Sequence, residues 1–278
     1  MSSTRTVRFT APEESFQKLE ADESFSSFFI HKHVKELIST DFSNILQLLK
    51  EELAFNTIFD EVWREATEIF KKNQMPKLRA ECQIAIIAYT IESGLYADFN
   101  EKCRKLDGDS SWNNFPYKSF YALLARSIHD IDNDPPVTIQ TYYRGVMHKV
   151  SNLKVGDCIF PRQFMSCKYN NVKEAEGLGD CGGTLMTFQD SPLAACGIKK
   201  LSVFPEEEEL LVFPWSVFEV TKIVPGEQDE VYLKTVESFE EDLPYCGNYK
   251  SKGVAVSNNN FPKKLAHLNF AKEHCETA

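Results

Sequence analysis

The stretch Phe204-Pro-Glu-Glu-Glu-Glu-Leu-Leu-Val-Phe-Pro-Trp-Ser-Val-Phe-Glu-Val220 decides how the rest of the chain is interpreted. Four consecutive glutamates run directly into an apolar segment rich in β-branched and aromatic residues, which is typical of a buried strand. Clustered carboxylates resist desolvation and normally stay on solvated faces. Here the strand pattern begins directly after them, so the last glutamates have to enter or border the sheet. Because successive strand residues point to opposite faces, we expect Glu207 and Glu209 to share one face, about 6.6 Å apart. Such a pair suits chemistry in which positive charge develops on a substrate. The competing interpretation is a set of charges that protects an aggregation-prone strand.

Two earlier segments place further polar residues on expected strands. Residues 137–146 read Val-Thr-Ile-Gln-Thr-Tyr-Tyr-Arg-Gly-Val, and their β-branched and aromatic content predicts a strand. Arg144 lies near its end and is followed by Gly145, where the backbone can approach a ligand closely. Ser166 follows a short loop and a strand-like segment. The order along the chain is therefore arginine, serine and then a Glu-x-Glu pair.

This order resembles the arginine-serine-glutamate class of mono-ADP-ribosyltransferases, in its vertebrate-type, arginine-specific branch. That branch tends to carry Tyr-Arg-Gly, then Phe-x-Ser-Thr-Ser, then Phe-Pro-x-Glu-x-Glu-Val-Leu. The matching residues here are Tyr143-Arg144-Gly145, Phe164-Met165-Ser166, and Phe204-Pro205 followed by Glu207, Glu209, Leu210 and Leu211. The helical half contributes Ala85-Ile-Ile-Ala-Tyr-Thr90, Leu95-Tyr96 and Phe99-Asn100. The resemblance spans roughly residues 55 to 224.

The resemblance implies a role for each glutamate of the pair. Glu209 would stabilise the positive charge that builds on the ribose when nicotinamide leaves NAD, and would hydrogen-bond a ribose hydroxyl. Glu207 would recognise and activate the guanidinium of an arginine acceptor. The bland alternatives are a strand-edge charge for Glu209 and one more charge in an acidic run for Glu207.

The other site residues are assigned in the same way. Arg144 would contact the NAD pyrophosphate or brace the site, and Gly145 would offer backbone groups to the nicotinamide amide. Ser166 would hydrogen-bond Glu209 and orient it. Tyr169 is the aromatic residue available in a polar flap expected over residues 168–183. A structural salt bridge for Arg144 and an ordinary strand serine at Ser166 are the competing interpretations.

The chain departs from the family pattern at two places. The usual Ser-Thr-Ser becomes Ser166-Cys167-Lys168, which removes the second hydroxyl. Relatives often place a phenylalanine later in the flap to stack on nicotinamide, whereas Leu178 lies in that region here and would stack more weakly. Both changes bear on turnover and NAD affinity more than on the fold.

Taken together, the resemblance implies an enzyme that transfers ADP-ribose from NAD to arginine side chains of acceptor proteins, with NADP as a possible second donor and no metal. Two alternatives remain open. One is NAD glycohydrolysis, in which water replaces the acceptor. The other is a catalytically impaired module that binds NAD or a protein partner, motivated by Cys167 and Lys168.

Composition limits the classes of partner. Of the 278 residues, 42% are hydrophobic and 26% are charged, as in an ordinary globular protein, and the net charge is −10. Phosphate recognition needs clustered Lys and Arg, so nucleic-acid binding is not expected. An acidic surface would instead tolerate or attract a basic protein acceptor. The oligomeric state is left open.

Neither end of the sequence has a hydrophobic segment typical of a secretory leader, a membrane span or a lipid anchor. We therefore expect a cytoplasmic protein, with a mature secreted form as the alternative. The eight cysteines lack metal-ligand spacing, and we expect them to be mostly reduced, buried thiols.

The order of hydrophobic patterns predicts an α+β fold. Apolar residues at helical spacing predict helices near residues 34–49, 55–70, 84–91 and 115–131. Strands are expected near residues 137–147, 157–166, 184–188, 198–204, 208–223 and 229–236. We therefore predict a helical half packed on a mostly antiparallel β-sandwich that binds NAD. The expected divisions are a flexible extension (1–30) and a single domain (31–278), with helical half 31–135, β half 136–240 and an irregular segment 241–278.

Overall fold

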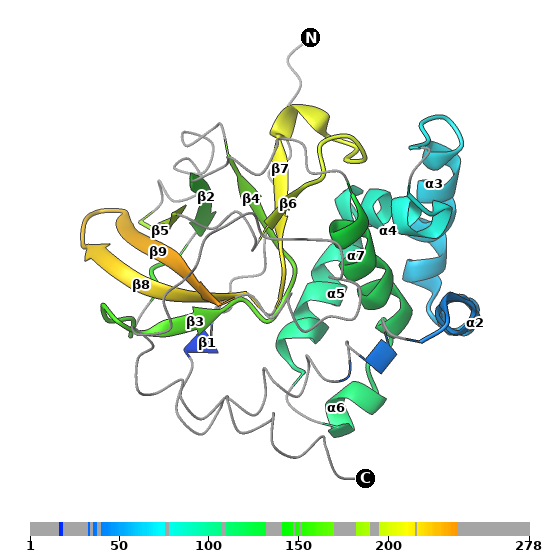
Figure 1. Ribbon diagram of the computed structural model, residues 1–278, viewed down its shortest axis with the longest axis horizontal. Helices are drawn as coiled ribbons and strands as arrows, with labels where there is room; N and C mark the ends of the chain where they lie inside the picture. The colour runs from blue at the N-terminus through cyan, green and yellow to red at the C-terminus, as the bar shows by residue number, and fades with distance from the viewer. Residues whose placement is uncertain are drawn as a thin grey trace, which may run out of the picture.

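A computed structural model describes residues 17–18, 33, 36–37, 40–75, 78–106, 109–131, 141–146, 148–150, 152–169, 182–189, 195–214 and 216–237. Within these residues a group of helices packs beside a curled sheet, as Figure 1 shows. The α+β class is therefore confirmed. Of the extension expected over residues 1–30, only the short strand β1 (Gln17–Lys18) is described, and the expected irregular segment 241–278 lies outside the described residues.

The helices precede the main strands in the chain. They are α2 (Phe42–Phe55), α3 (Thr57–Phe70), α4 (Ala80–Thr90), α5 (Gly94–Arg104), α6 (Asp109–Asn113) and α7 (Lys118–Asp130). Asn56 separates α2 from α3, and its side chain caps α3 by accepting a hydrogen bond from the Phe59 backbone N–H at 3.1 Å. The helices α5 and α6 were not predicted, because α5 is polar on average and α6 is only five residues long.

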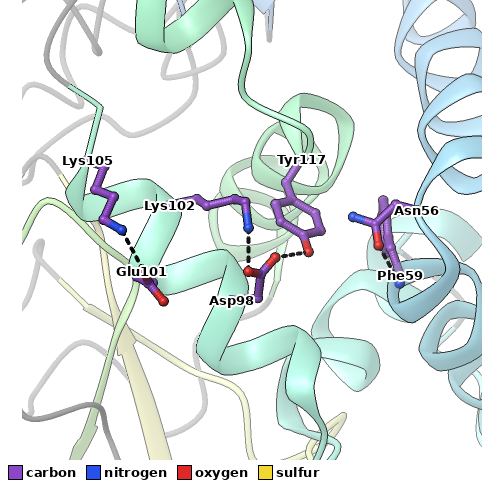
Figure 2. Close-up of polar contacts among 7 residues, drawn as sticks. All are labelled: Asn56, Phe59, Asp98, Glu101, Lys102, Lys105 and Tyr117. Atoms are coloured by element: carbon purple, nitrogen blue, oxygen red, sulfur yellow. Dashed lines mark hydrogen bonds and ion pairs between the residues drawn. The ribbon is translucent and has the colours of Figure 1, made fainter.

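Helix α5 is fixed by polar contacts on its exposed side (Figure 2). Asp98 accepts hydrogen bonds from Lys102 and from the hydroxyl of Tyr117, which begins the segment leading into α7. Burial alone would raise the pKa of Asp98, but the hydrogen bonds from Lys102 and Tyr117 outweigh it and lower the pKa. The opposite side of α5 is buried in the helical core, so the polar contacts and the apolar packing hold α5 in one orientation.

The strands form one continuous hydrogen-bonded sheet within the described residues, in the order β1-β3-β8-β9-β5-β2-β4-β7-β6. Their bounds are β2 (Thr141–Val146), β3 (Cys158–Phe160), β4 (Met165–Lys168), β5 (Thr184–Gln189), β6 (Ala195–Gly197), β7 (Glu209–Val212), β8 (Val217–Val224) and β9 (Asp229–Glu237). Neighbouring strands are antiparallel except for the parallel pair β5–β9. The mostly antiparallel sheet agrees with the sequence prediction.

Several strand boundaries differ from the prediction. The strand expected over 208–223 is two strands, because Pro214 follows β7 and the Ser216 backbone N–H bonds to the Phe213 carbonyl in a turn. The strand expected over 198–204 is instead a turn region after β6. The strand expected over 157–166 is divided between β3 and β4.

Two hydrophobic cores flank strand β7. Leu211 packs into the first core, which the helices dominate, whereas Leu210 and Val212 pack into the second core, between the two halves of the curled sheet. This alternation is what period-2 strand geometry requires, and it leaves every residue of β7 buried. The second core draws side chains from strands in both halves of the sheet, in agreement with the predicted sandwich.

The cysteines that the structure describes are free and mostly buried thiols, as predicted. Cys82, Cys103, Cys167 and Cys196 are buried free thiols, and Cys158 is a half-buried one. The other three cysteines lie outside the described residues. No helix in the described part of the chain is long and apolar enough to cross a membrane.

Candidate active site

Three neighbouring strands bring the predicted site residues together. Strand β4 lies between β2 and β7, so the strands that carry Arg144, Ser166 and Glu209 are hydrogen-bonded side by side. Lys168 is paired across the sheet with Tyr143 on one side and with Glu209 on the other. Residues about 20 to 65 positions apart in sequence are thus collected at one place in the sheet.

Glu209 is the first residue of β7 and is almost completely buried, with 1% of its surface exposed. The residues before it are not in a strand. Pro205–Glu207 forms a 3₁₀ turn, and Glu208 adopts the left-handed conformation at φ 48° and ψ 48°. The strand-alternation argument for Glu207 and Glu209 is therefore wrong, because the chain turns between them. A buried carboxylate is costly to maintain, which points to a functional role for Glu209.

The turn before Glu209 fixes where the carboxylate lies. The backbone N–H of Glu207 bonds to the Phe204 carbonyl at 3.0 Å, and the Glu209 carbonyl accepts from the Ile198 N–H at 3.0 Å. The left-handed Glu208 redirects the chain from the turn into the sheet. Glu206 stays exposed on the turn, so the four glutamates of the acidic run have different environments.

Arg144 is buried on β2 and braces the neighbouring strand. It is 6% exposed, and its Nη1 donates a hydrogen bond to the Ser166 carbonyl oxygen at 2.6 Å. Its buried Nε has no hydrogen-bond partner among the residues that the structure describes. One donor of the guanidinium thus holds β4, while a second, buried donor is unsatisfied.

The pKa values of two buried neighbours register the charges of the site. Burial raises the pKa of the Cys167 thiol to about 12, with the Arg144 cation opposing this shift and the Glu209 carboxylate adding to it. Burial also raises the pKa of Tyr89 well above its usual range, and both charges act on it as well. The charges of Arg144 and Glu209 therefore both act on the same two buried side chains.

Ser166 contributes through its backbone. The expected hydrogen bond from its hydroxyl to Glu209 is not among the contacts of these two described residues, so the orienting role of Ser166 stays a prediction. Strand alternation places Ser166 on the same face of the sheet as Glu209 and Leu211, opposite to Cys167 and Leu210. This arrangement is compatible with a shared ligand.

Helix α4 supports two of the three site segments. The Tyr89 hydroxyl donates to the Phe164 carbonyl at 2.8 Å and accepts from Asn100 Nδ2 at 3.1 Å, all within the buried core. The Thr90 hydroxyl accepts from the Val203 backbone N–H at 3.1 Å, three residues before the first glutamate of the acidic run. Sequence reasoning named Tyr89 and Thr90 only as part of the resemblance. Their signal was polar groups at the end of an otherwise apolar helix.

The acidic run also makes two ion pairs with lysines. Lys168 Nζ lies 3.5 Å from Glu207 Oε2, and Lys199 Nζ lies 2.9 Å from Glu208 Oε1. Lys168 is one of the residues at which the chain departs from the family pattern. Its contact with Glu207 was not predicted from the sequence.

The family model described as NAD:arginine ADP-ribosyltransferase matches residues 21–239. The chain belongs to this family. It is 30% identical over 187 residues to the erythroblast NAD(P)(+)--arginine ADP-ribosyltransferase of Gallus gallus, covering 64% of this chain. It is 31% identical over 192 residues to ecto-ADP-ribosyltransferase 5 of Bos taurus, covering 63% of this chain. These matches span 60% and 57% of the two relatives' own lengths.

Solved structures of another mono-ADP-ribosyltransferase share the fold. A mutant of the eukaryotic mono-ADP-ribosyltransferase ART2.2 in complex with NADH superposes with a TM-score of 0.57 at 23% identity. The match covers 69% of this chain and 83% of that chain. The helical group beside a curled sheet is thus the architecture of the family.

The relatives correct the expected localisation. They include ecto-ADP-ribosyltransferase 5 of Homo sapiens and a GPI-linked NAD(P)(+)--arginine ADP-ribosyltransferase 1 of Mus musculus, names that indicate the cell surface or the exterior. The expectation of a cytoplasmic protein is therefore wrong. It rested on the lack of hydrophobic segments at the two ends of the sequence, which does not determine the compartment.

Two further residues that the sequence assigned to NAD binding are described. Gly145 is buried in β2, opposite Leu185 of β5, and Tyr169 is half-buried directly after β4. Most of the expected flap, including Leu178, lies outside the described residues.

Proposed function

We propose that this chain transfers ADP-ribose from NAD to an arginine side chain of an acceptor protein and releases nicotinamide. The observation that carries the proposal is the buried carboxylate of Glu209, positioned beside the strand of Ser166 and two strands from that of Arg144 in a member of this family.

The reaction requires a fixed negative charge at the ribose. The bond between nicotinamide N1 and ribose C1′ breaks, and its electron pair stays with nicotinamide, which departs neutral. Positive charge builds on the ribose ring at the same time, as in glycoside hydrolysis. A carboxylate held rigidly in a buried position stabilises that charge more in the transition state than in the ground state. Glu209 fills this role.

The donor nucleotide is held by the other site residues. Arg144 supplies the cation that faces the anionic pyrophosphate, while the Ser166 carbonyl keeps the guanidinium in place. Gly145 gives backbone groups to the nicotinamide amide, Tyr169 packs against the nicotinamide ring, and Ser166 orients Glu209. Several relatives carry NAD(P)(+) in their names, so NADP should be tested as a second donor in the same assay. Side chains supply every charge in this scheme, and it uses no metal.

The acceptor is recognised by Glu207. The carboxylate pairs with the planar guanidinium and takes the proton that the nitrogen loses as it forms the new bond to ribose C1′. The chain's net charge of −10 favours a basic acceptor protein.

The test measures nicotinamide released from NAD by the purified protein, with and without agmatine as an arginine mimic, in the presence of EDTA. We expect release to rise with agmatine and ADP-ribosyl-agmatine to form. Glu209→Gln is expected to lower turnover at least about 100-fold. Glu206→Gln is the matched control, because Glu206 is an exposed glutamate of the same run.

Glu207→Gln separates the two glutamate roles. We expect it to abolish transfer to agmatine while acceptor-free nicotinamide release is largely kept. Equal loss of both activities would contradict the assigned division of labour, and release that ignores agmatine in the unmodified protein would favour a glycohydrolase.

A further inference from the structure

The contact between Lys168 and Glu207 places a cation of the chain itself on the carboxylate assigned to the acceptor. Lys168 is the last residue of β4, and its backbone is paired with Glu209. Its Nζ lies 3.5 Å from Glu207 Oε2. The side chains of Lys168 and Glu207 are 17% and 29% exposed, so the ion pair is partly shielded from water.

We propose that Lys168 competes with the acceptor guanidinium for Glu207, and so sets the balance between ADP-ribose transfer to arginine and transfer to water. The inference rests on the proposed function, and it makes Lys168 a residue that determines acceptor specificity.

The competition follows from charge and tethering. An arginine acceptor has to approach Glu207 as a cation, and a carboxylate already paired with an ammonium attracts a second cation less. The ammonium is tethered by the short β4 strand, so it is present at a high effective concentration that an acceptor in solution has to overcome. The planar guanidinium binds a carboxylate in a bidentate manner, whereas the ammonium is a point charge, so a good acceptor still displaces it.

The two fates of the ribose differ in their sensitivity to this contact. Water carries no charge, so its attack on the ribose does not require Lys168 to leave Glu207. An arginine acceptor does require this, because its guanidinium binds the same carboxylate. Lys168 therefore raises the acceptor concentration needed for transfer, and weak or sparse acceptors lose to hydrolysis.

The chain provides a matched control. Lys199 forms an ion pair of the same kind with Glu208, the next glutamate in the run, at 2.9 Å. Glu208 has no assigned role in catalysis. Replacing either lysine by methionine keeps the apolar stem and removes one positive charge, so the two variants compare the loss of a cation at Glu207 with its loss at Glu208.

The experiment measures KM for agmatine and the ratio of ADP-ribosyl-agmatine to free ADP-ribose in the unmodified protein, K168M and K199M. We expect K168M to lower the KM for agmatine by between roughly 3-fold and 10-fold, the range of a partly buried ion pair, and to raise the product ratio. K199M is expected to change neither. A K168M variant with an unchanged or higher KM for agmatine would overturn the proposal, and a higher KM would indicate that Lys168 helps to hold Glu207 for the acceptor.

A binding measurement keeps this inference separate from the proposed activity. Agmatine is titrated calorimetrically into each protein saturated with a non-hydrolysable NAD analogue. Tighter binding of agmatine to K168M than to K199M supports competition even if the protein turns over no NAD. A lack of turnover would refute the proposed function and leave the competition standing. Equal binding to the two variants refutes the competition whether or not the enzyme is active.

Discussion

Replacement of Tyr89 by phenylalanine tests whether the helical half holds the active-site strand in place. The Tyr89 hydroxyl donates to the Phe164 carbonyl and accepts from Asn100 Nδ2, and Phe164 precedes strand β4. Tyr89 and Phe164 are both 0% exposed, and Asn100 is 2% exposed. The substitution keeps the ring, so its apolar packing against Tyr96 and Phe99 is unchanged.

The magnitude follows from the two groups that lose their partner. A buried carbonyl and a buried amide N–H are left without the Tyr89 oxygen, and each such group costs about 1–3 kcal/mol. Water cannot reach these atoms without opening the core, so little of the cost is recovered. We expect the free energy of unfolding to fall by about 2–6 kcal/mol, and Tm to fall by roughly 4–24 °C.

Chemical denaturation of four variants, one of them the double variant, measures the effect. Tyr232→Phe is the control, because the Tyr232 hydroxyl donates to Glu230 in a half-buried position and its loss should cost less than about 1 kcal/mol. Asn100→Ala, combined with Tyr89→Phe in a double-mutant cycle, should reveal a coupling of about 1 kcal/mol. A Tyr89→Phe loss no larger than that of the control, with no coupling to Asn100, would refute the reasoning.

Three further changes probe other parts of the structure. At pH 8, iodoacetamide should alkylate Cys167 at least about 100-fold more slowly in the folded than in the denatured protein, by peptide mass spectrometry, because its thiol pKa is raised to about 12. The neutral thiol stabilises the fold below pH 9, and that contribution is lost as pH rises toward 12. Arg144→Lys should raise the KM for NAD about 10-fold in steady-state assays, because lysine lacks the wide planar fork with which the guanidinium bonds to the Ser166 carbonyl and reaches a ligand at the same time. Glu52 caps α7 by accepting a hydrogen bond from the Ser119 backbone N–H, and burial raises its pKa. The protonated form of Glu52 is therefore favoured in the folded state. Its contribution to stability is complete below the unfolded pKa and is lost as pH rises through the folded pKa. Glu52→Gln should flatten that pH dependence in urea denaturation.

The fold class was predictable because the hydrophobic period changes from helical to alternating near residue 136. Individual boundaries were less so. The apolar run after Glu209 predicted one long strand, but Pro214 interrupts it, and the two pieces lie in different parts of the sheet. Helix α5 was missed because its stability comes from tertiary contacts, such as the Asp98 hydrogen bonds, more than from its own sequence pattern.

The strands that carry the site were predictable from motif order, but their detailed geometry was not. Arg144, Ser166 and Glu209 lie on adjacent strands as the motif order indicated. Alternation failed for Glu207 because Glu208 adopts a left-handed conformation that no local residue preference announced. The contact of Lys168 with Glu207 depends on the β4–β7 register, which a sequence without its pairing partners cannot supply.

Two adjacent residues of α4 connect the helical half to the segment that carries Ser166 and to the segment that carries Glu209. Tyr89 holds the carbonyl two residues before Ser166, and Thr90 holds the N–H of Val203, just before the turn that leads to Glu209. The segments are also joined to each other through β4–β7 pairing, so the site is fixed by a closed loop of contacts. In such an arrangement neither segment can shift alone without breaking a buried hydrogen bond. Because α4 is buried along almost its whole length, displacing it would disturb the helical core as well. The rigidity that a preorganised carboxylate requires therefore comes from the helices, and their packing is part of what makes Glu209 effective.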